Sequence, residues 1–306
     1  MNGATHVIVL MVPSGTQFEL KSVEQAVEMT GGAVLERRAM PVPVTLSAPP
    51  AVHNFWIDCR DEAGLSQRLR GLSDQHRVDL ALQPRAVRTR RYRLAVFDMD
   101  STLIDCEVID ELAAAAGVGD EVAAITASAM RGEVDFDESF RTRLALLKGL
   151  NAEAVDVLAD RLPIKAGLRE MTTTLRARGM TLAIVSGGFL PVARRLQQDF
   201  GFDEVVANEL EIKGGVVTGA VIPPIVNREH KAMALQGLAD RLGIDVEQSI
   251  AVGDGANDLS MMALAGMGVA FHAKPAVRAA SPIEVIYGGL DGLCYLLGSE
   301  GEFGAE

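Results

Sequence analysis

Short β-rich runs and stretches with apolar residues at helical spacing alternate along the first 83 positions of the chain. The runs predict strands, and the spaced apolar residues predict amphipathic helices. A loop is expected where prolines cluster, at Pro41, Pro43, Pro49 and Pro50. The expected elements form a small α+β domain in the order βαββαβ: strand His6–Met11, helix Leu20–Met29, strands Ala33–Val42 and Val52–Cys59, helix Leu65–Asp74 and strand Val78–Leu82.

From Leu94 onward the pattern changes to short, wholly apolar runs that alternate with amphipathic helices. This alternation is typical of an α/β fold with a doubly wound, mostly parallel sheet. Residues 107 to about 162 show helical stretches and no expected strand, so we predict a small helical cap inserted after the first strand. The expected strands are Leu94–Asp98, Thr181–Ser186, Glu204–Ala207, Ser249–Asp254, Met267–Phe271 and Ile283–Tyr287, with a hairpin of Glu209–Lys213 and Val216–Ala220.

Composition narrows the class of protein. A formal net charge of −12 argues against nucleic-acid binding, which favours clustered Lys and Arg. The basic run from Arg85 to Arg93 lies in a segment, 84–93, between the predicted domains at 1–83 and 94–306, so we interpret it as a solvated linker. Three cysteines in no metal-ligand spacing favour a reducing compartment, the opening residues lack the basic region of a signal peptide, and no apolar stretch approaches the roughly 18 residues of a membrane span. We expect a cytoplasmic protein with neither nucleic acid nor membrane as a partner.

The first candidate motif is an acid pair, Asp98 and Asp100, directly after the apolar run Leu94–Phe97. In strand geometry a spacing of two places both carboxylates on the same side. One carboxylate can then attack while the other handles protons, and the pair can share a divalent cation. Such pairs are also common in solvated loops, but the apolar strand before this one and the hydroxyls of Ser101 and Thr102 after it favour a site.

Two further motifs are candidates for binding an anion. Ser186-Gly187-Gly188 follows a strand and precedes a helix, which places a hydroxyl and open backbone N–H groups at a helix N-terminus. The alternative is an ordinary strand-to-helix turn capped by Ser186. Lys231 stands near the start of a helix expected at Glu229–Leu242, where a positive charge opposes the helix dipole unless an anion is bound nearby. The alternative here is a solvated side chain.

The fourth motif, Gly253-Asp254-Gly255-Ala256-Asn257-Asp258, follows another apolar run. Asp254 and Asp258 are four apart and can lie on one face of the turn. Carboxylate oxygens are the ligands that Mg²⁺ prefers. Because open α/β sheets bind ligands at the carboxyl ends of their strands, we expect all four motifs to converge on one pocket.

In this order the motifs resemble the four motifs of the haloacid dehalogenase-like superfamily. Cys106-Glu107 and the stretch 136–149, which begins at Phe136 and includes Arg143, resemble the phosphoserine phosphatase family within it. The resemblance covers residues 94 to about 290, although Ala166-Gly167 stands where the family more often has Pro-Gly. It implies a Mg²⁺-dependent hydrolase whose small-molecule substrate is O-phosphoserine, acting at the last step of serine biosynthesis.

The resemblance also implies a role for each motif residue. Asp98 would be the nucleophile that forms an aspartyl-phosphate, and Asp100 would protonate the leaving oxygen and then activate water. Mg²⁺ would be held by Asp98, the backbone carbonyl of Asp100 and Asp254, with Asp258 in a supporting position. The resemblance further implies that Glu107 would bind the substrate ammonium and Arg143 its carboxylate. Phe136 would help to close the cap, and Thr102 would support the site. The phosphoryl oxygens would be bound by Ser186, Gly187, Lys231 and Asn257.

The first domain resembles ACT-type modules in the order of its elements, but the loop from Val12 to Thr16 lacks the turn typical of them. A role in packing or pairing, including a possible homodimer through this domain, is the alternative to amino-acid binding. Two other functions remain open: a phosphatase or phosphotransferase for another small phosphomonoester, and a regulatory amino-acid-binding protein with a degenerate enzyme domain. The four intact motifs argue against the second.

Overall fold

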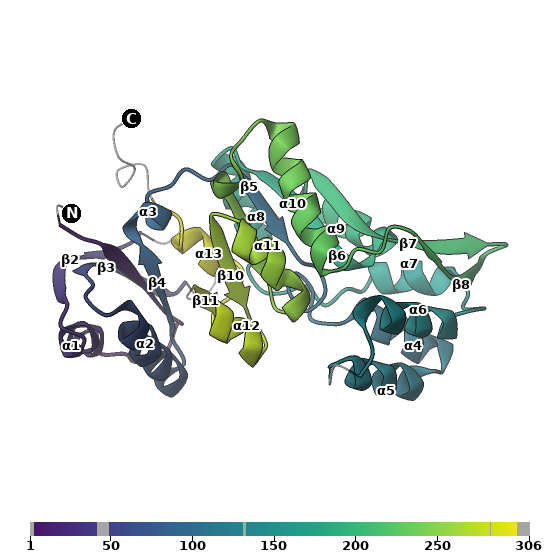
Figure 1. Cartoon of the computed structure of the whole chain (residues 1–306), viewed down its shortest axis with the longest axis horizontal. Helices are drawn as coiled ribbons and strands as arrows, with labels where there is room; N and C mark the ends of the chain where they lie inside the picture. The colour runs from purple at the N-terminus through teal and green to yellow at the C-terminus, as the bar shows by residue number, and fades with distance from the viewer. Residues whose placement is uncertain (1–2, 42–48, 131–132, 282, 299–306) are drawn as a thin grey trace.

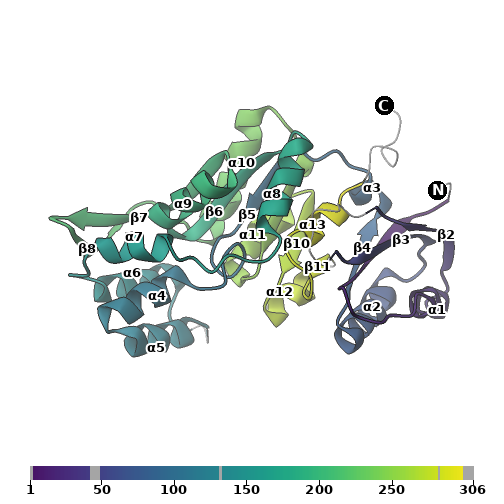
Figure 2. The ribbon, with the colours of Figure 1, turned by 180° about the vertical axis from the view of Figure 1, so that it is seen from behind.

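The structure, a computed structural model, describes residues 3–41, 49–130, 133–281 and 283–298. A small domain lies at one end of an elongated molecule, a large α/β domain fills the middle, and a group of helices lies at the other end (Figure 1). Figure 2 shows the same arrangement from behind. None of the described helices is both long and apolar enough to cross a membrane.

The small domain confirms the predicted βαββαβ order. Its elements are β1 (His6–Val12), α1 (Lys21–Met29), β2 (Ala33–Ala39), β3 (Ala51–Asp58), α2 (Glu62–His76) and β4 (Asp79–Pro84). The described strands form an antiparallel sheet in the order β2-β3-β1-β4, so that β1 lies inside the sheet. Val42, the predicted end of the second strand, and Pro43 of the predicted loop lie outside the described residues.

The large domain confirms the predicted α/β fold with a mostly parallel sheet. Its strands are β5 (Leu94–Phe97), β6 (Thr181–Phe189), β7 (Glu204–Lys213), β8 (Val216–Ile222), β9 (Ser249–Gly253), β10 (Met267–Phe271) and β11 (Glu284–Val285). Over the described ranges their order is β11-β10-β9-β5-β6-β7-β8, and every neighbouring pair is parallel except β7 with β8. One continuous strand, β7, replaces the strand predicted at Glu204–Ala207 and the first predicted strand of the hairpin. It pairs with β6 along its first half and with β8 along its second half.

Helices cover both faces of this sheet, as doubly wound folds require. They are α8 (Leu168–Ala177), α9 (Leu190–Phe200), α10 (Arg228–Leu242), α11 (Leu259–Leu264), α12 (Pro275–Ala280) and α13 (Gly292–Tyr295), with 3₁₀ turns at Val246–Gln248 and Ala256–Asp258. Figure 1 shows α10 and α11 in front of the sheet, and Figure 2 shows α8 and α9 in front of the opposite face. The faces are apolar because β5 and the Leu182–Val185 part of β6 are continuous apolar runs.

The predicted insertion after β5 forms the helical cap. Its helices are α4 (Val108–Ala116), α5 (Gly119–Met130), α6 (Phe136–Leu146) and α7 (Glu153–Ala159). The side chain of Asp135 caps α6 by accepting hydrogen bonds from the N–H groups of Asp137 and Glu138. The end of the cap is tied to the β7–β8 hairpin, because the Val217 carbonyl accepts from Gly149 at 2.9 Å. The cap is therefore held to the sheet by this hydrogen bond as well as by the two chain segments that connect it to the large domain.

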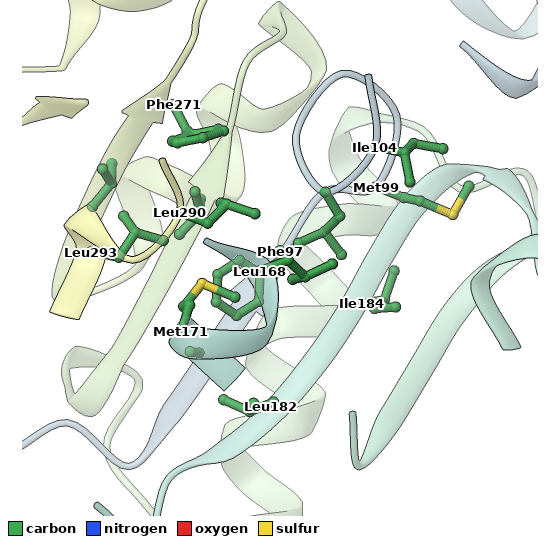
Figure 3. Close-up of a cluster of buried hydrophobic side chains, with 14 of the residues drawn as sticks. Phe97, Met99, Ile104, Leu168, Met171, Leu182, Ile184, Phe271, Leu290 and Leu293 are labelled. Atoms are coloured by element: carbon green, nitrogen blue, oxygen red, sulfur yellow. The ribbon is translucent and has the colours of Figure 1, made fainter. Parts of the chain in front are cut away.

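One apolar cluster holds the first strand of the large domain in place. Phe97 of β5, Leu182 and Ile184 of β6, and Leu168 and Met171 of α8 are all buried in it. Figure 3 shows these side chains gathered between helix and sheet. Each such side chain contributes about 1.5–3 kcal/mol by burial, so the strand end that carries the acid pair is well fixed.

Both faces of the small domain's sheet are buried. On one face, side chains such as Ile8 and Phe55 pack with α1 and α2. On the opposite face, Val7, Val9 and Trp56 belong to the apolar cluster of the large domain. The two domains are therefore joined by a packed interface as well as by the chain.

The structure corrects the interpretation of the basic run as a solvated linker. Its first residues form the short helix α3 (Arg85–Arg88), and Arg88 is fully buried. The guanidinium of Arg88 donates to the carbonyl of Tyr295 at 2.6 Å, at the end of α13, where a cation is favourable. Arg90 pairs with Glu247 at 2.6 Å. The segment is therefore only partly solvated: Arg85, Arg91 and Arg93 are exposed, whereas Arg88 and Tyr92 are buried.

Substitution of Trp56 tests the contribution of the interface to stability. The side chain is fully buried between the domains. Trp56→Ala leaves a large cavity and should lower the free energy of unfolding by about 3–5 kcal/mol in chemical denaturation. Leu35→Ala is the control, because Leu35 is 47% exposed on β2 and should cost no more than about 0.5 kcal/mol. A similar small loss for both variants would show that the interface contributes little.

Candidate active site

The carboxyl ends of neighbouring parallel strands meet at one edge of the large sheet. β5 lies between β6 and β9, with Phe97 opposite Ile184 on one side and Val252 on the other. The N–H of Asp98 donates to the Val252 carbonyl at 2.9 Å, so the ladder continues one residue past the strand. The acid pair, the serine–glycine motif and the glycine–aspartate motif therefore emerge side by side.

A cluster of buried carboxylates lies at this edge. Oxygens of Asp98, Asp254 and Asp258 lie within 4.8 Å of one another, and each residue is at most 4% exposed. Burial raises the pKa of Asp254, and the charge of Asp98 raises it further. Buried anions need cations, and carboxylate oxygens are the ligands that Mg²⁺ prefers. The cluster fits a divalent cation, and Asp258, expected in a supporting position, lies within it.

Lys231 balances part of this negative charge. It is fully buried, and its Nζ donates to Oδ1 of Asp98 and Oδ1 of Asp258, both at 2.7 Å. Burial alone would lower the pKa of Lys231, but Asp258 and Asp98 outweigh it and raise the pKa above its ordinary value. Asn227 caps α10 by accepting from the N–H of His230, which fixes the turn that carries the lysine. The partners of Lys231 here are carboxylates, and its predicted contact with phosphoryl oxygens remains a prediction.

The serine–glycine motif extends β6 up to the start of α9. Ser186 is fully buried, and its Oγ accepts from the N–H of Gly188 at 2.9 Å. A Cβ on Gly188 would lie 2.5 Å from Cε of Met99 and 2.7 Å from Oδ2 of Asp100, so a larger residue would displace the acid pair. Pro191 stands in the first turn of α9, as predicted.

A cavity of about 490 Å³ lies between these strand ends and the cap. From the strand ends it is lined by Asp98, Asp100, Ser186, Gly187, Asp254 and Asn257, and from the cap by Glu107, Thr126, Phe136, Phe140 and Arg143. Phe136 stacks on Phe140, with ring centroids 6.3 Å apart, and Phe140 contacts Phe189 of the core at 6.0 Å. These rings form an apolar wall across the boundary between cap and core. Lys231, Asp258 and Thr102 are fully buried and do not line the cavity.

The cap presents opposite charges to the cavity through Glu107 and Arg143. Oε1 of Glu107 accepts from the hydroxyl of Ser101 at 2.8 Å, and burial raises the pKa of Glu107. Arg143 donates to the Ser139 carbonyl at 3.4 Å and to Oγ1 of Thr126 at 3.5 Å. Both distances are long for hydrogen bonds, so the guanidinium keeps donor capacity for a ligand.

Asp100 is suited to carrying a proton. It lines the cavity two residues beyond Asp98, and Oδ1 of Asp100 accepts from the N–H of Val108 at 3.4 Å. Burial raises the pKa of Asp100 well above its usual range, and the charges of Glu107 and Asp98 raise it further. These surroundings therefore favour the protonated form of Asp100. Asp98, in contrast, is paired with the ammonium of Lys231.

Sequence reasoning missed two residues at the site. Lys274 lines the cavity, and its Nζ lies 3.3 Å from Oδ2 of Asp254. Asn208 is buried and donates to the Gly187 carbonyl at 2.7 Å while it accepts from the N–H of Val226 at 2.8 Å. A signal existed for Lys274, because it closely follows a predicted strand and so lies at the same sheet edge as the motifs. No local pattern pointed to Asn208.

Comparison with known proteins identifies the protein family to which the chain belongs. Residues 95–263 match the family described as haloacid dehalogenase-like hydrolase. The chain belongs to this family.

Its similar relatives narrow the comparison further. The chain is 46% identical over 226 residues to the phosphoserine phosphatase SerB2 of Mycobacterium tuberculosis, a match that covers 74% of this chain and 55% of the relative. It is 41% identical over 251 residues to the phosphoserine phosphatase of Archaeoglobus fulgidus, covering 81% of this chain and 73% of the relative. A solved haloacid dehalogenase family hydrolase of Salmonella enterica serovar Typhi has a TM-score of 0.83 at 31% identity, covering 96% of this chain and 99% of that one. The chain thus spans about half the length of the mycobacterial relative.

Proposed function

We propose that this protein hydrolyses O-phosphoserine to serine and phosphate, with Mg²⁺ and an aspartyl-phosphate intermediate. The observation that carries the proposal is the cavity, which sets a cluster of buried carboxylates opposite Glu107 and Arg143 of the cap. Phosphoserine carries a phosphate, an ammonium and a carboxylate. Glu107 and Arg143 offer opposite charges to the ammonium and the carboxylate, and Mg²⁺ held by the carboxylate cluster would offer one to the phosphate. The names of the relatives support the same substrate.

Asp98 and Asp100 perform the two chemical steps in this proposal. Asp98 attacks phosphorus, and the bond from phosphorus to the serine oxygen breaks as Asp100 gives that oxygen a proton. Asp100 then takes a proton from water, which attacks the same phosphorus and releases phosphate and a free Asp98 carboxylate. Their positions agree with these roles, because both line the cavity at the end of β5.

The remaining residues bind and orient the substrate. Glu107 receives the ammonium and Arg143 the carboxylate, while the aromatic wall of the cap excludes water. Ser186, Gly187 and Asn257 bind the phosphoryl oxygens, and Lys231 holds Asp98 from behind. Magnesium, when bound by Asp98, Asp254 and the Asp100 carbonyl with Asp258 in support, supplies the positive charge that phosphoryl transfer requires.

Phosphate release from a panel of phosphomonoesters tests the proposal. Phosphoserine should be the best substrate, excess chelator should abolish activity, and Mg²⁺ should restore it. Ca²⁺ should substitute poorly, because its longer bonds and higher coordination number misplace the nucleophile. Full activity in excess chelator would contradict the metal assignment.

The second candidate is a phosphatase or phosphotransferase for another small phosphomonoester. The apolar part of the cavity wall, at Phe136 and Phe140, favours it, since this wall would accept other small organic groups. A higher kcat/KM on a substrate without an ammonium or carboxylate would select this candidate. Product analysis with an added alcohol separates transfer from hydrolysis.

We propose that the small domain is an ACT-like module, as the order of its elements indicates, and that its role is to pack against the large domain. The sheet face that carries Val7 and Trp56 is covered by the large domain. A dimer through this domain would have to use its other surfaces, and sedimentation of the purified protein tests for one.

A further inference from the structure

One wall of the active site is the start of helix α12. Lys274 directly precedes this helix, and Lys274, Ala276 and Val277 line the cavity. Lys274 holds Asp254 at two points: its Nζ lies 3.3 Å from Oδ2, and its backbone N–H donates to the Asp254 carbonyl at 3.1 Å. The position of α12 therefore sets the position of Lys274 and constrains Asp254.

The opposite end of α12 is held by the small domain. Arg70 of α2 donates from Nη2 to the carbonyl of Arg278 at 2.6 Å and to the carbonyl of Ser281 at 2.7 Å. These carbonyls lie at the C-terminal end of α12, where helix carbonyls lack partners within the helix and a cation is favourable. The helix is about 9 Å long, at 1.5 Å per residue, so a shift at one end reaches the other.

Further bonds fix the same region to the small domain. Asp74 pairs with Arg278 at 2.9 Å. Asp79 is 1% exposed and accepts from the N–H groups of Ile286, Tyr287 and Gly288 at 2.6, 3.0 and 2.7 Å. The loop of residues 286–288 also contacts the segment before Lys274: the ring of His272 forms a hydrogen bond with the Gly288 carbonyl at 2.8 Å. The small domain thus holds the C-terminal end of α12 directly and the segment before Lys274 indirectly, through residues 286–288, although it supplies no described residue to the cavity lining.

We infer that Arg70 is a positioning residue of the active site, which acts through α12 on Lys274 and Asp254. The inference rests on the proposed function of that site. It gives the small domain a part in catalysis that the positions of the sequence motifs did not predict. It also means that any displacement of α2 is transmitted to the cavity.

The first experiment compares Arg70→Met with Arg68→Met. Both variants remove one positive charge from α2, but Arg68 is exposed and its described contact is with Met29 of the same domain. Arg70→Met should lower kcat/KM for phosphoserine about three- to thirtyfold, the range for groups in one network, and Arg68→Met should stay within about twofold. Arg70→Lys, which keeps one donor group, should recover part of the loss. It also replaces Arg70→Met if that variant does not fold.

The second experiment repeats Arg70→Met in the Lys274→Met background. If Arg70 acts through Lys274, its substitution should have a much smaller effect there, because only the backbone contact of residue 274 with Asp254 remains. Amide hydrogen exchange of the peptide 272–281 should be faster in Arg70→Met than in wild type or Arg68→Met, a readout that needs no substrate. An equal loss in both backgrounds, or an Arg70 variant that behaves like the Arg68 variant, would overturn the inference.

These results are separable from failure of the proposed function. If wild-type protein does not turn over phosphoserine but hydrolyses another phosphomonoester, the proposed substrate is wrong. The same variants are then compared on the ester that is hydrolysed, and the exchange measurement is unchanged. A positioning role of Arg70 would be excluded only by an equal loss in both backgrounds or by an Arg70 variant that behaves like the Arg68 variant.

Discussion

Asp98→Asn is expected to lower phosphoserine turnover by at least about 10⁴-fold while leaving the protein folded. The neutral amide is too poor a nucleophile to accept a phosphoryl group, so the first step of the proposed reaction is lost. Acid-quenched wild-type enzyme should carry phosphate on Asp98, and the variant should carry none. Retention of more than about a tenth of wild-type activity would contradict covalent catalysis at this residue.

The fold should tolerate this substitution because Lys231 keeps a second carboxylate partner. Its Nζ also donates to Asp258 at 2.7 Å, so the buried ammonium is not left unpaired. The amide also removes one negative charge from a crowded cluster of carboxylates. Circular dichroism and a thermal melt should therefore resemble wild type. Asp105→Asn is the matched control, since the Asp105 side chain is 70% exposed in its pair with Lys165 and should be silent in the activity assay.

The parts of the fold that could be predicted are those encoded by local patterns. Runs such as Leu94–Phe97 are wholly apolar because parallel strands are buried on both faces, and all the predicted strands of the large domain occur. The acid pair, the serine–glycine motif and the glycine–aspartate motif could be placed as well, because each follows such a run and the carboxyl ends of the strands share one edge. Lys231 is different, because it lies near the start of a helix and not at a strand end. Among the strands, the exception is β7, whose two halves pair with different partners.

The contacts that could not be predicted join residues far apart in sequence. Arg70 and the carbonyls it binds are 208 and 211 positions apart, and no periodicity records such a pair. The position of Lys274 shortly after β10 indicated the sheet edge on which it lies, but its contact with Asp254 depends on the placement of α12, which no local pattern records.

A signal for the domain interface was present in β1. The strand reads HVIVLMV, with apolar residues on both faces, whereas an antiparallel sheet with one solvated face would alternate. The uninterrupted run therefore indicated that the second face is covered. The buried Arg88 follows from the same packing, since a segment between two docked domains has a neighbour on each side.

Arg143→Ala is expected to lower kcat/KM for phosphoserine by about 2–4 kcal/mol, roughly 30- to 1000-fold. The guanidinium lines the cavity, and its hydrogen bonds to protein groups are long, at 3.4 and 3.5 Å. A substrate carboxylate can therefore form the shorter, charge-assisted pair that planar guanidinium groups favour. Burial lowers the pKa of Arg143, so pairing with an anion also offsets the cost of a buried charge.

The specificity of this loss decides between phosphoserine and phosphate esters in general. Phosphoethanolamine keeps the phosphate and the ammonium but lacks the carboxylate, so Arg143→Ala should reduce its kcat/KM by less than about tenfold. Arg141→Ala is the matched control: Arg141 is exposed on the same helix, two positions earlier, and an exposed charge is worth under about 1 kcal/mol. Equal losses on the two substrates would assign Arg143 a structural role in the cap. Such a result would remove the main support for phosphoserine and leave the chemistry at Asp98 unaffected, because the two residues act on different ends of the substrate.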